Sequence, residues 1–293
     1  MTHHDPHEEF SHDDFGGLHR DLAATGAAMD RRGLFRLAAR IGGAVGAFHL
    51  IGCGDSPTSP TAVTTTAGTT TTPTTTTTPP TTTNPTSTCS KIPEETQGPF
   101  PGDGSNGPNV LSASGVVRND IRTSFAGLSG TADGVPLTIV LNIVSASTCA
   151  PLAGRAVYLW HCDRLGRYSL YSQGVTNQNY LRGTQEADAN GRVTFTSIYP
   201  GCYAGRWPHI HFEVYPSLSA ATNVSNRVAT SQIALTKDTA DLVYASAGYD
   251  GSARNLSQIS LATDNVFSDG SALELATVSG SVAGFTSSLT VAI

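Results

Sequence analysis

An uncharged tract divides this 293-residue chain and limits how much of it can fold. Residues 56–88 are almost entirely Thr, Pro and Ser, with a few Ala, Gly, Val and Asn. Such a segment has no apolar periodicity and cannot bury enough surface to offset the entropy lost on folding. Proline also keeps it extended, at up to about 3.1 Å per residue. We therefore expect a disordered linker at residues 54–88 and a folded domain after it.

The segment before the linker has the features of an export signal. The pair Arg31-Arg32 precedes a weakly apolar stretch, residues 37–51, which contains Arg40 and is a poor membrane-spanning helix. A mild apolar stretch after an arginine pair is typical of a twin-arginine signal. The sequence LIGC, ending at Cys53, resembles a bacterial lipoprotein box. We therefore predict that residues 1–53 are a signal segment and that the exported, extracytoplasmic protein is anchored to a bacterial membrane by a lipid on Cys53.

Two other interpretations of this segment remain open. The apolar stretch could instead form a short core helix that ends at Gly52. The His- and Asp-rich residues 3–14 could bind a metal rather than form an extended start to the signal. The uncharged linker that follows at once favours the signal.

Residues 89–293 carry 12 Lys and Arg against 15 Asp and Glu. This acidic balance argues against a nucleic-acid partner, which requires a basic surface. No apolar run reaches the roughly 18 residues of a membrane-spanning helix. We therefore expect membrane contact only through the lipidated Cys53. The 205 residues are enough for one well-buried core.

The folded region reads as an all-β domain. Short runs rich in β-formers recur between turn signals, as in an antiparallel β-sandwich or barrel. The sequence offers helical periodicity only near residues 238–245, and the Gly- and Ser-rich residues 251–293 look like further strands of unreadable role. The predicted strands are residues 135–144, 156–160, 192–196, 209–215 and 231–235.

His209 and His211 form the strongest candidate for a metal site. On a strand, residues i and i+2 share a face, so both imidazoles point the same way and could bind one metal. They are two of only three histidines in the region, and a turn-rich segment containing Tyr203 and Arg206 precedes them. Phenolate oxygens are hard donors that suit ferric iron, and tyrosine ligation of iron has precedent. The pattern alone also allows Zn or Cu on the two histidines.

Four segments resemble the intradiol ring-cleavage dioxygenases, the family of protocatechuate 3,4-dioxygenase and catechol 1,2-dioxygenase. LWHCDRLGRYS at residues 159–169 and PGCYAGRWPHIHF at residues 200–212 carry most of the resemblance. PEETQGPF at residues 93–100 and VRNDIR at residues 117–122 extend it. The resemblance implies an antiparallel β-sandwich of the intradiol dioxygenase type within a catalytic domain at residues 89–293.

The same resemblance implies an Fe(III) cofactor with four ligands: Tyr168, Tyr203, His209 and His211. It further implies that substrate binding releases Tyr203, that Arg206 stabilises charge on the bound ring, and that Gln232 lies near the oxygen pocket. The interval from Tyr203 to His209 is shorter than in the protocatechuate enzymes and resembles a secreted, single-subunit branch of the family.

The implied reaction cleaves a catechol with O₂ between its two hydroxylated carbons and gives a muconate-type diacid. A non-catalytic iron- or ligand-binding sandwich remains an alternative. Tyr171, Tyr180 or Tyr199 could also replace a ligand, whereas His161 is expected to be structural. The sequence leaves open which catechol is used and whether the protein forms oligomers.

Five cysteines are present, and the lipoprotein box accounts for Cys53. An exported domain is expected to oxidise the other four, which allow three pairings. We favour Cys162–Cys202, because these residues lie beside the two segments that carry the chemistry. The second predicted pair is Cys89–Cys149, which would attach the start of the domain to the sheet. Four buried thiols are the alternative.

Overall fold

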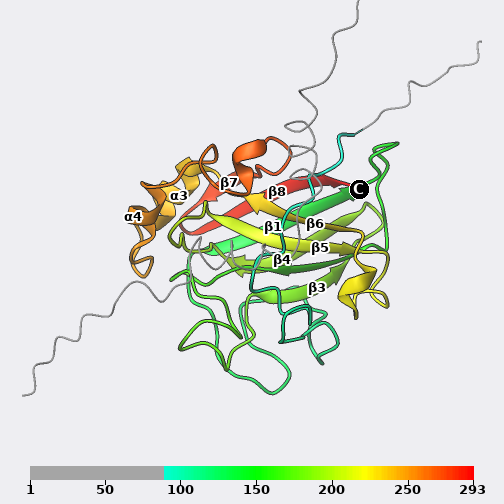
Figure 1. Cartoon of the computed structure of the whole chain (residues 1–293), viewed down its shortest axis with the longest axis horizontal. Helices are drawn as coiled ribbons and strands as arrows, with labels where there is room; N and C mark the ends of the chain where they lie inside the picture. Colours follow the sequence, from blue (N-terminus) through cyan, green and yellow to red (C-terminus); the bar gives the residue numbers. More distant parts are fainter. Residues whose placement is uncertain (1–88) are drawn as a thin grey trace, which may run out of the picture. The chain divides into compact units, whose positions relative to one another are not determined.

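The computed structural model describes residues 89–293, which form the coloured part of Figure 1. The predicted signal segment, the lipidated Cys53 and the linker lie outside these residues, so they stay predictions. Within residues 89–293, none of the helices has the length and apolar character needed to cross a membrane.

Two four-stranded sheets make up the domain (Figure 1). One has the strand order β4-β1-β8-β7 and the other has the order β3-β2-β5-β6. Neighbouring strands are antiparallel, except that β1 and β8 are parallel. This antiparallel-rich, mostly β architecture confirms the predicted fold class. The strands are β1 (Pro136–Val144), β2 (Ala156–Trp160), β3 (Arg182–Glu186), β4 (Arg192–Ile198), β5 (His209–Tyr215), β6 (Ala229–Ala234), β7 (Thr277–Ser281) and β8 (Gly284–Ala292).

Within residues 89–293, helical structure is confined to short segments beside the sheets. The helix α3 (Lys237–Tyr244) occupies the one region with helical periodicity, and α4 (Ser252–Leu256) follows it. Two single turns of 3₁₀ helix, η2 (Val224–Asn226) and η3 (Phe267–Asp269), complete the set in this part of the chain.

Strand β3 was not predicted, because its sequence RGTQE lacks the alternation of a half-buried strand. It forms by antiparallel pairing along the whole of β2. The strands β7 and β8 confirm the expectation of further strands within residues 251–293.

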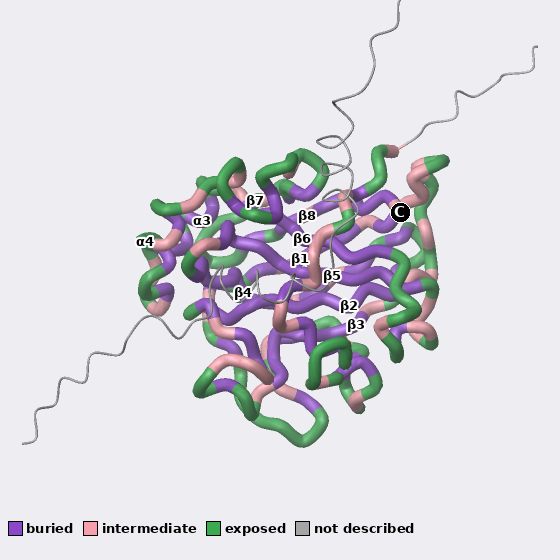
Figure 2. The backbone as a smooth tube through the Cα atoms, viewed as in Figure 1, coloured by how far each residue is buried: buried purple, intermediate pink, exposed green. Residues whose placement is uncertain are grey.

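The main core lies between the two sheets. Alternate residues of β5, Ile210, Phe212 and Val214, join residues of β1 such as Ile139 and Leu141 in one apolar cluster. Because strand side chains alternate, His209 and His211 lie on the opposite face of β5. Loops cover that face as well, so all seven residues of β5 are buried (Figure 2).

The second apolar cluster explains how the outer face of this sheet is covered. It combines Tyr158 and Trp160 of β2 with Val110 and Leu111 of the preceding segment. Tyr168 and Tyr203, from two different loops, belong to the same cluster. The candidate ligands therefore lie in an apolar layer between the sheet and its covering loops.

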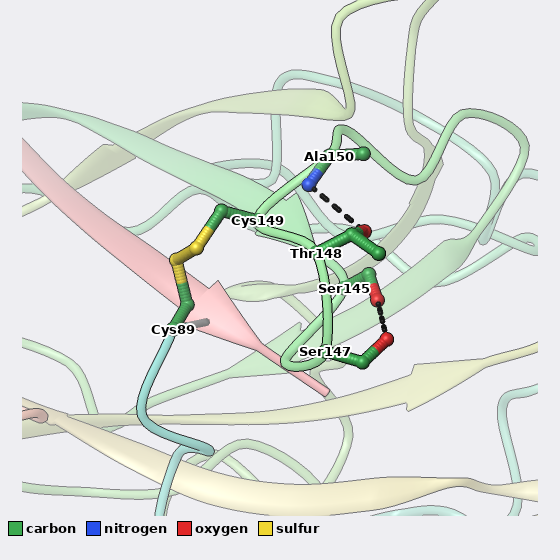
Figure 3. Close-up of a disulfide and its surroundings, with 6 residues drawn as sticks. All are labelled: Cys89, Ser145, Ser147, Thr148, Cys149 and Ala150. Carbon is green, nitrogen blue, oxygen red and sulfur yellow. Dashed lines mark hydrogen bonds between the residues drawn. A yellow bond between two sulfur atoms is a disulfide. The ribbon is translucent and has the colours of Figure 1, made fainter. Parts of the chain in front are cut away.

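The disulfide Cys89–Cys149 confirms one predicted pair (Figure 3). Its Cα atoms lie 5.3 Å apart, and the Cys89 amide also donates to the carbonyl oxygen of Ala146 at 3.0 Å. The bond therefore attaches the start of the described domain to the loop after β1.

The predicted disulfide Cys162–Cys202 was wrong, because both residues are buried free thiols. Cys162 packs in the outer cluster and Cys202 in the core between the sheets. Each Sγ faces a backbone carbonyl, that of Gly201 at 3.4 Å and that of Arg206 at 3.5 Å respectively. Although both cysteines lie near the same site, their sulfur atoms are not positioned to form a disulfide.

Candidate metal centre

Four side-chain donor atoms meet on the outer face of β5. The Tyr168 hydroxyl lies 3.3 Å from His209 Nε2 and 3.2 Å from His211 Nε2. The Tyr203 hydroxyl lies 3.1 Å from His209 Nε2, and the two Nε2 atoms are 3.1 Å apart. None of the four residues is more than 6% exposed. The structure thus brings together all four side chains that the sequence resemblance implied as ligands.

Two glycines allow the tyrosine loops to approach each other. Tyr168 lies between β2 and β3, and Tyr203 lies between β4 and β5. A Cβ atom on Gly166 would lie 2.9 Å from the Cβ of Tyr203, and its φ of 79° also favours glycine. A Cβ atom on Gly201 would lie 2.5 Å from the carbonyl oxygen of Arg164. The glycine in each motif is therefore a packing requirement of the site.

Asp163 organises the turn that leads to Tyr168. Its carboxylate accepts hydrogen bonds from the amides of Leu165 and Arg167 and from the Arg167 Nε, at 2.9–3.0 Å. The hydroxyl of Tyr180 donates to the same carboxylate at 3.1 Å. Arg167 is therefore an ion-pair partner of Asp163, and Tyr180 points away from the cluster.

The two histidines are oriented in different ways. His209 Nδ1 donates to the carbonyl oxygen of Trp207 at 2.5 Å, which leaves a lone pair on Nε2 facing the tyrosines. His211 Nδ1 has no hydrogen-bond partner; its ring instead stacks on Trp160, with centroids 5.0 Å apart and planes 5° from parallel. Gly98 lies on His211 as well, since a Cβ there would be 3.2 Å from Cε1.

Electrostatics favours neutral imidazoles at this site. Burial lowers the pKa of His209 well below its usual value, and the charge of Arg206 lowers it further. Burial also lowers the pKa of His211, with added contributions from His209 and Arg206. Neutral imidazole is the form that binds metals.

The donor set itself indicates which metal it suits. Within residues 89–293, no three His, Cys, Asp or Glu side chains gather as a metal site would require. Beside the two imidazoles, the tyrosine hydroxyls are the donor groups that lie in this cluster. Two imidazoles alone fall short of the three protein ligands of a catalytic zinc site. Two phenolate oxygens and two neutral nitrogens suit a hard ferric ion.

Arg206 is only 1% exposed, and its charge acts on both histidines of the cluster. Its Nε donates to Asp264 at 3.0 Å, and its Nη2 donates to Gln232 Oε1 at 2.7 Å. The amide of Gln232 donates in turn to the carbonyl oxygen of Thr96 at 2.8 Å. Gln232 lies opposite His211 in the pairing of β5 with β6. Both predicted polar residues thus lie near the donors, and Gln232 links Arg206 to the N-terminal segment.

Comparison with known proteins shows what the domain resembles. Residues 106–209 match a family model described as Dioxygenase. An intradiol ring-cleavage dioxygenase from Tetranychus urticae is 24% identical, with a TM-score of 0.55 over 70% of this chain and 95% of that one. The folded domain therefore has the fold of an intradiol ring-cleavage dioxygenase. A crystal structure described as a dioxygenase is 26% identical, with a TM-score of 0.55 over 70% of this chain and 94% of its own.

The other candidate residues from the sequence have structural roles in this domain. His161 is buried between the carbonyl oxygen of Cys162 at 2.8 Å and the hydroxyl of Ser197 at 2.7 Å. Burial lowers its pKa to about 4. The hydroxyl of Tyr171 donates to Asn106 at 2.8 Å, and Tyr199 packs in the core between the sheets. Neither tyrosine takes the place of a predicted ligand.

Sequence reasoning missed the residues that support the candidate site from a distance. Arg182 of β3 is 1% exposed and donates to the carbonyl oxygens of Phe100, Pro101 and Ser169 at 2.7–2.9 Å. It therefore connects the N-terminal segment to the turn that carries Tyr168. An arginine in a short polar run gave no signal of this role.

The region after residue 250 also supports the site. Ser252 and Asn255 of α4 bind the backbone amide and carbonyl of Cys202, at 3.0 and 2.8 Å. Asp264 binds Arg206, as described above. The role of this region, unreadable in the sequence, includes positioning the segment that contains Tyr203.

Proposed function

We propose that the protein is an Fe(III)-dependent intradiol dioxygenase. It would cleave a catechol-type ring between the two hydroxylated carbons, with both atoms of O₂ entering a muconate-type diacid. The observation that carries this proposal is the convergence of two tyrosine hydroxyls and two histidine Nε2 atoms, 3.1–3.3 Å apart, in a buried layer. The match of residues 106–209 to the Dioxygenase family model and the structural similarity to a dioxygenase support this proposal.

Tyr168, Tyr203, His209 and His211 would hold the iron. The two phenolates would offset two of the three charges of Fe(III), and the neutral imidazoles would complete the set without adding charge. When bound, ferric iron supplies the Lewis acidity and one-electron chemistry that make a catechol reactive towards O₂.

The protein's own residues would bind and orient the substrate. Tyr203 is 6% exposed and Tyr168 is 2% exposed, so Tyr203 is the less enclosed of the two. Its Oη would leave the site on substrate binding and take up a catechol proton. Arg206, whose charge reaches both histidines, would stabilise negative charge that accumulates on the ring.

The direct test is product analysis after oxygen uptake. The iron-loaded full-length chain would be offered simple catechol, protocatechuate, hydroxyquinol and lignin-derived catechols under ¹⁸O₂. We expect a diacid that carries both labelled atoms from at least one of them. Absence of oxygen uptake with every catechol would refute catalysis, and an iron-coloured but inactive protein would favour a non-catalytic binding module.

A pair of tyrosine variants makes the test specific to the site. Tyr203→Phe removes a proposed ligand and is expected to abolish most of the oxygen uptake. Tyr171→Phe removes a nearby hydroxyl that points to Asn106, and it should change the rate less than about 2-fold. Equal losses in both variants would contradict the ligand assignment.

We further propose that the protein is exported and tethered through a lipid on Cys53. The disulfide Cys89–Cys149 supports this location, because such bonds persist in oxidising compartments. Expressed in a bacterium with its own signal, the wild type should sediment with membranes, and Cys53→Ser should move it to the soluble fraction. The same distribution for both proteins would exclude a lipid anchor at Cys53.

A further inference from the structure

Asp264 forms a fully buried ion pair with Arg206. The carboxylate Oδ2 lies 3.0 Å from Arg206 Nε, and neither side chain has exposed surface. The two residues are 58 positions apart in the sequence. Removing charges from water is costly unless they are paired and hydrogen-bonded, so an ion pair retained here needs a reason.

Hydrogen bonds fix the Asp264 carboxylate from both sides. Its Oδ2 also accepts from the amide of Trp207 at 2.6 Å, in the turn before β5. Its Oδ1 accepts from the amides of Val266 and Phe267, at 2.8 and 3.2 Å. The carboxylate is therefore a rigid link between the start of η3 and the turn that carries Arg206.

This link orients the guanidinium of Arg206. Asp264 fixes Nε, and Gln232 accepts from Nη2 at 2.7 Å. Of these two partners, only Asp264 carries a charge that offsets that of the arginine. Because hydrogen bonds hold both Nε and Nη2, the guanidinium is pre-organised beside the donor cluster.

We propose that Asp264 is a positioning residue for the reaction, acting through Arg206 on the negative charge of a bound catecholate. This inference rests on the proposed function. Before substrate binds, the carboxylate offsets the buried positive charge. During the reaction, it keeps the guanidinium aligned where charge accumulates on the ring. A variant that loses the alignment of Arg206 should therefore show a larger decrease in kcat than increase in KM.

Asp264→Asn keeps the size and shape of the side chain but removes part of the hydrogen bonding that aligns Arg206. An asparagine has one oxygen, but the native carboxylate accepts from N–H groups on both sides. Whichever way the amide turns, its NH₂ group faces other donors, so one set of hydrogen bonds is lost. We expect kcat to fall about 10-fold or more, with KM changed less than about 3-fold. Asp241→Asn, which removes a surface partner of Lys237, is the matched control and should keep both constants.

A double-mutant cycle with Arg206→Met distinguishes alignment from a general structural role. If Asp264 acts through Arg206, Asp264→Asn should cause no further loss of kcat in the Arg206→Met background. The iron content and visible spectrum of each resting variant should match those of the wild type. Losses that multiply in the double variant, or a spectrum altered by Asp264→Asn alone, would overturn the inference in favour of a structural role through Trp207.

Further measurements keep the inference separate from the proposed function. Asp264→Glu retains the charge but displaces it, so it should give an intermediate kcat even if the asparagine variant fails to fold. Anaerobic titration of the iron-loaded proteins with catechol gives an affinity that requires no turnover, and it should change less than about 3-fold. A wild type that binds no catechol overturns the proposed function and this inference with it. An active wild type matched in kcat by the Asp264 variants overturns this inference alone.

Discussion

At the scale of single residues, the two histidines show that backbone geometry and side-chain packing both orient the candidate ligands. The strand places both rings on one face, but only His209 gains a hydrogen bond at Nδ1. His211 depends on stacking against Trp160. The two rings should therefore respond differently to changes in their surroundings.

Removing either histidine is expected to abolish iron retention. His209→Ala or His211→Ala takes one donor from a set of four, which should lower iron affinity by more than the 10- to 100-fold typical of an outer contact. Metal analysis after dialysis measures the loss. His161→Gln is the control, because His161 bonds to Ser197 and lies outside the donor cluster. Iron content that is unchanged in the alanine variants would refute the assignment.

Trp160 is expected to control His211 specifically. Trp160→Leu removes the stacked ring, so we predict an iron affinity about 10-fold lower. Trp160→Phe keeps an aromatic face and should retain most of the affinity. Competition with a chelator measures both, with thermal melting to confirm folding. The prediction is wrong if the leucine and phenylalanine variants bind iron equally well.

At the scale of elements, the local sequence pattern predicted the strands better than it predicted the tertiary contacts that hold them in place. β2 and β5 have the predicted bounds. β2 is a continuous apolar run, and β5 alternates polar and apolar residues along most of its length. β3 forms only through pairing and through the buried Arg182. Likewise, the His209-x-His211 pair could be read from a strand's period, whereas Asp264 reaches Arg206 only through tertiary folding.

Arg182 provides a stability prediction for the covering loops. Arg182→Leu would leave the carbonyl oxygens of Phe100, Pro101 and Ser169 without this donor. We expect the free energy of unfolding to fall by about 3 kcal/mol or more, because each buried unsatisfied group costs about 1–3 kcal/mol. Arg192→Leu, at an exposed position of β4, should stay within about 0.5 kcal/mol. Denaturant unfolding compares them, and similar losses in both would contradict this role.

At the scale of the whole molecule, one disulfide secures the start of the domain. It closes a loop with a sequence separation of 60 residues, so its loss should lower the free energy of unfolding by about 2–5 kcal/mol. Urea unfolding with and without reductant measures this. The double variant Cys89→Ser/Cys149→Ser should be equally destabilised and insensitive to reductant. The prediction would be contradicted if the reductant left the urea unfolding midpoint of the wild type unchanged.

The wrong disulfide prediction shows that the sequence did not reveal how the buried cysteines are placed in the fold. Cys162 and Cys202 both lie near the tyrosine loops, but strand order and loop packing decide which layer each thiol enters. No local pattern encodes that choice. The four candidate ligands, by contrast, came from motifs whose glycines, Gly166 and Gly201, the loop packing itself requires.

We propose that Tyr168, Tyr203, His209 and His211 together bind ferric iron. The most direct measurement is the visible absorption spectrum of the full-length protein loaded with Fe(III). Tyrosinate coordination predicts a strong charge-transfer band, a burgundy to red colour and a spectrum that changes in Tyr203→Phe. An iron-loaded protein that stays colourless, or a Tyr203→Phe variant with an unchanged spectrum, would contradict the account.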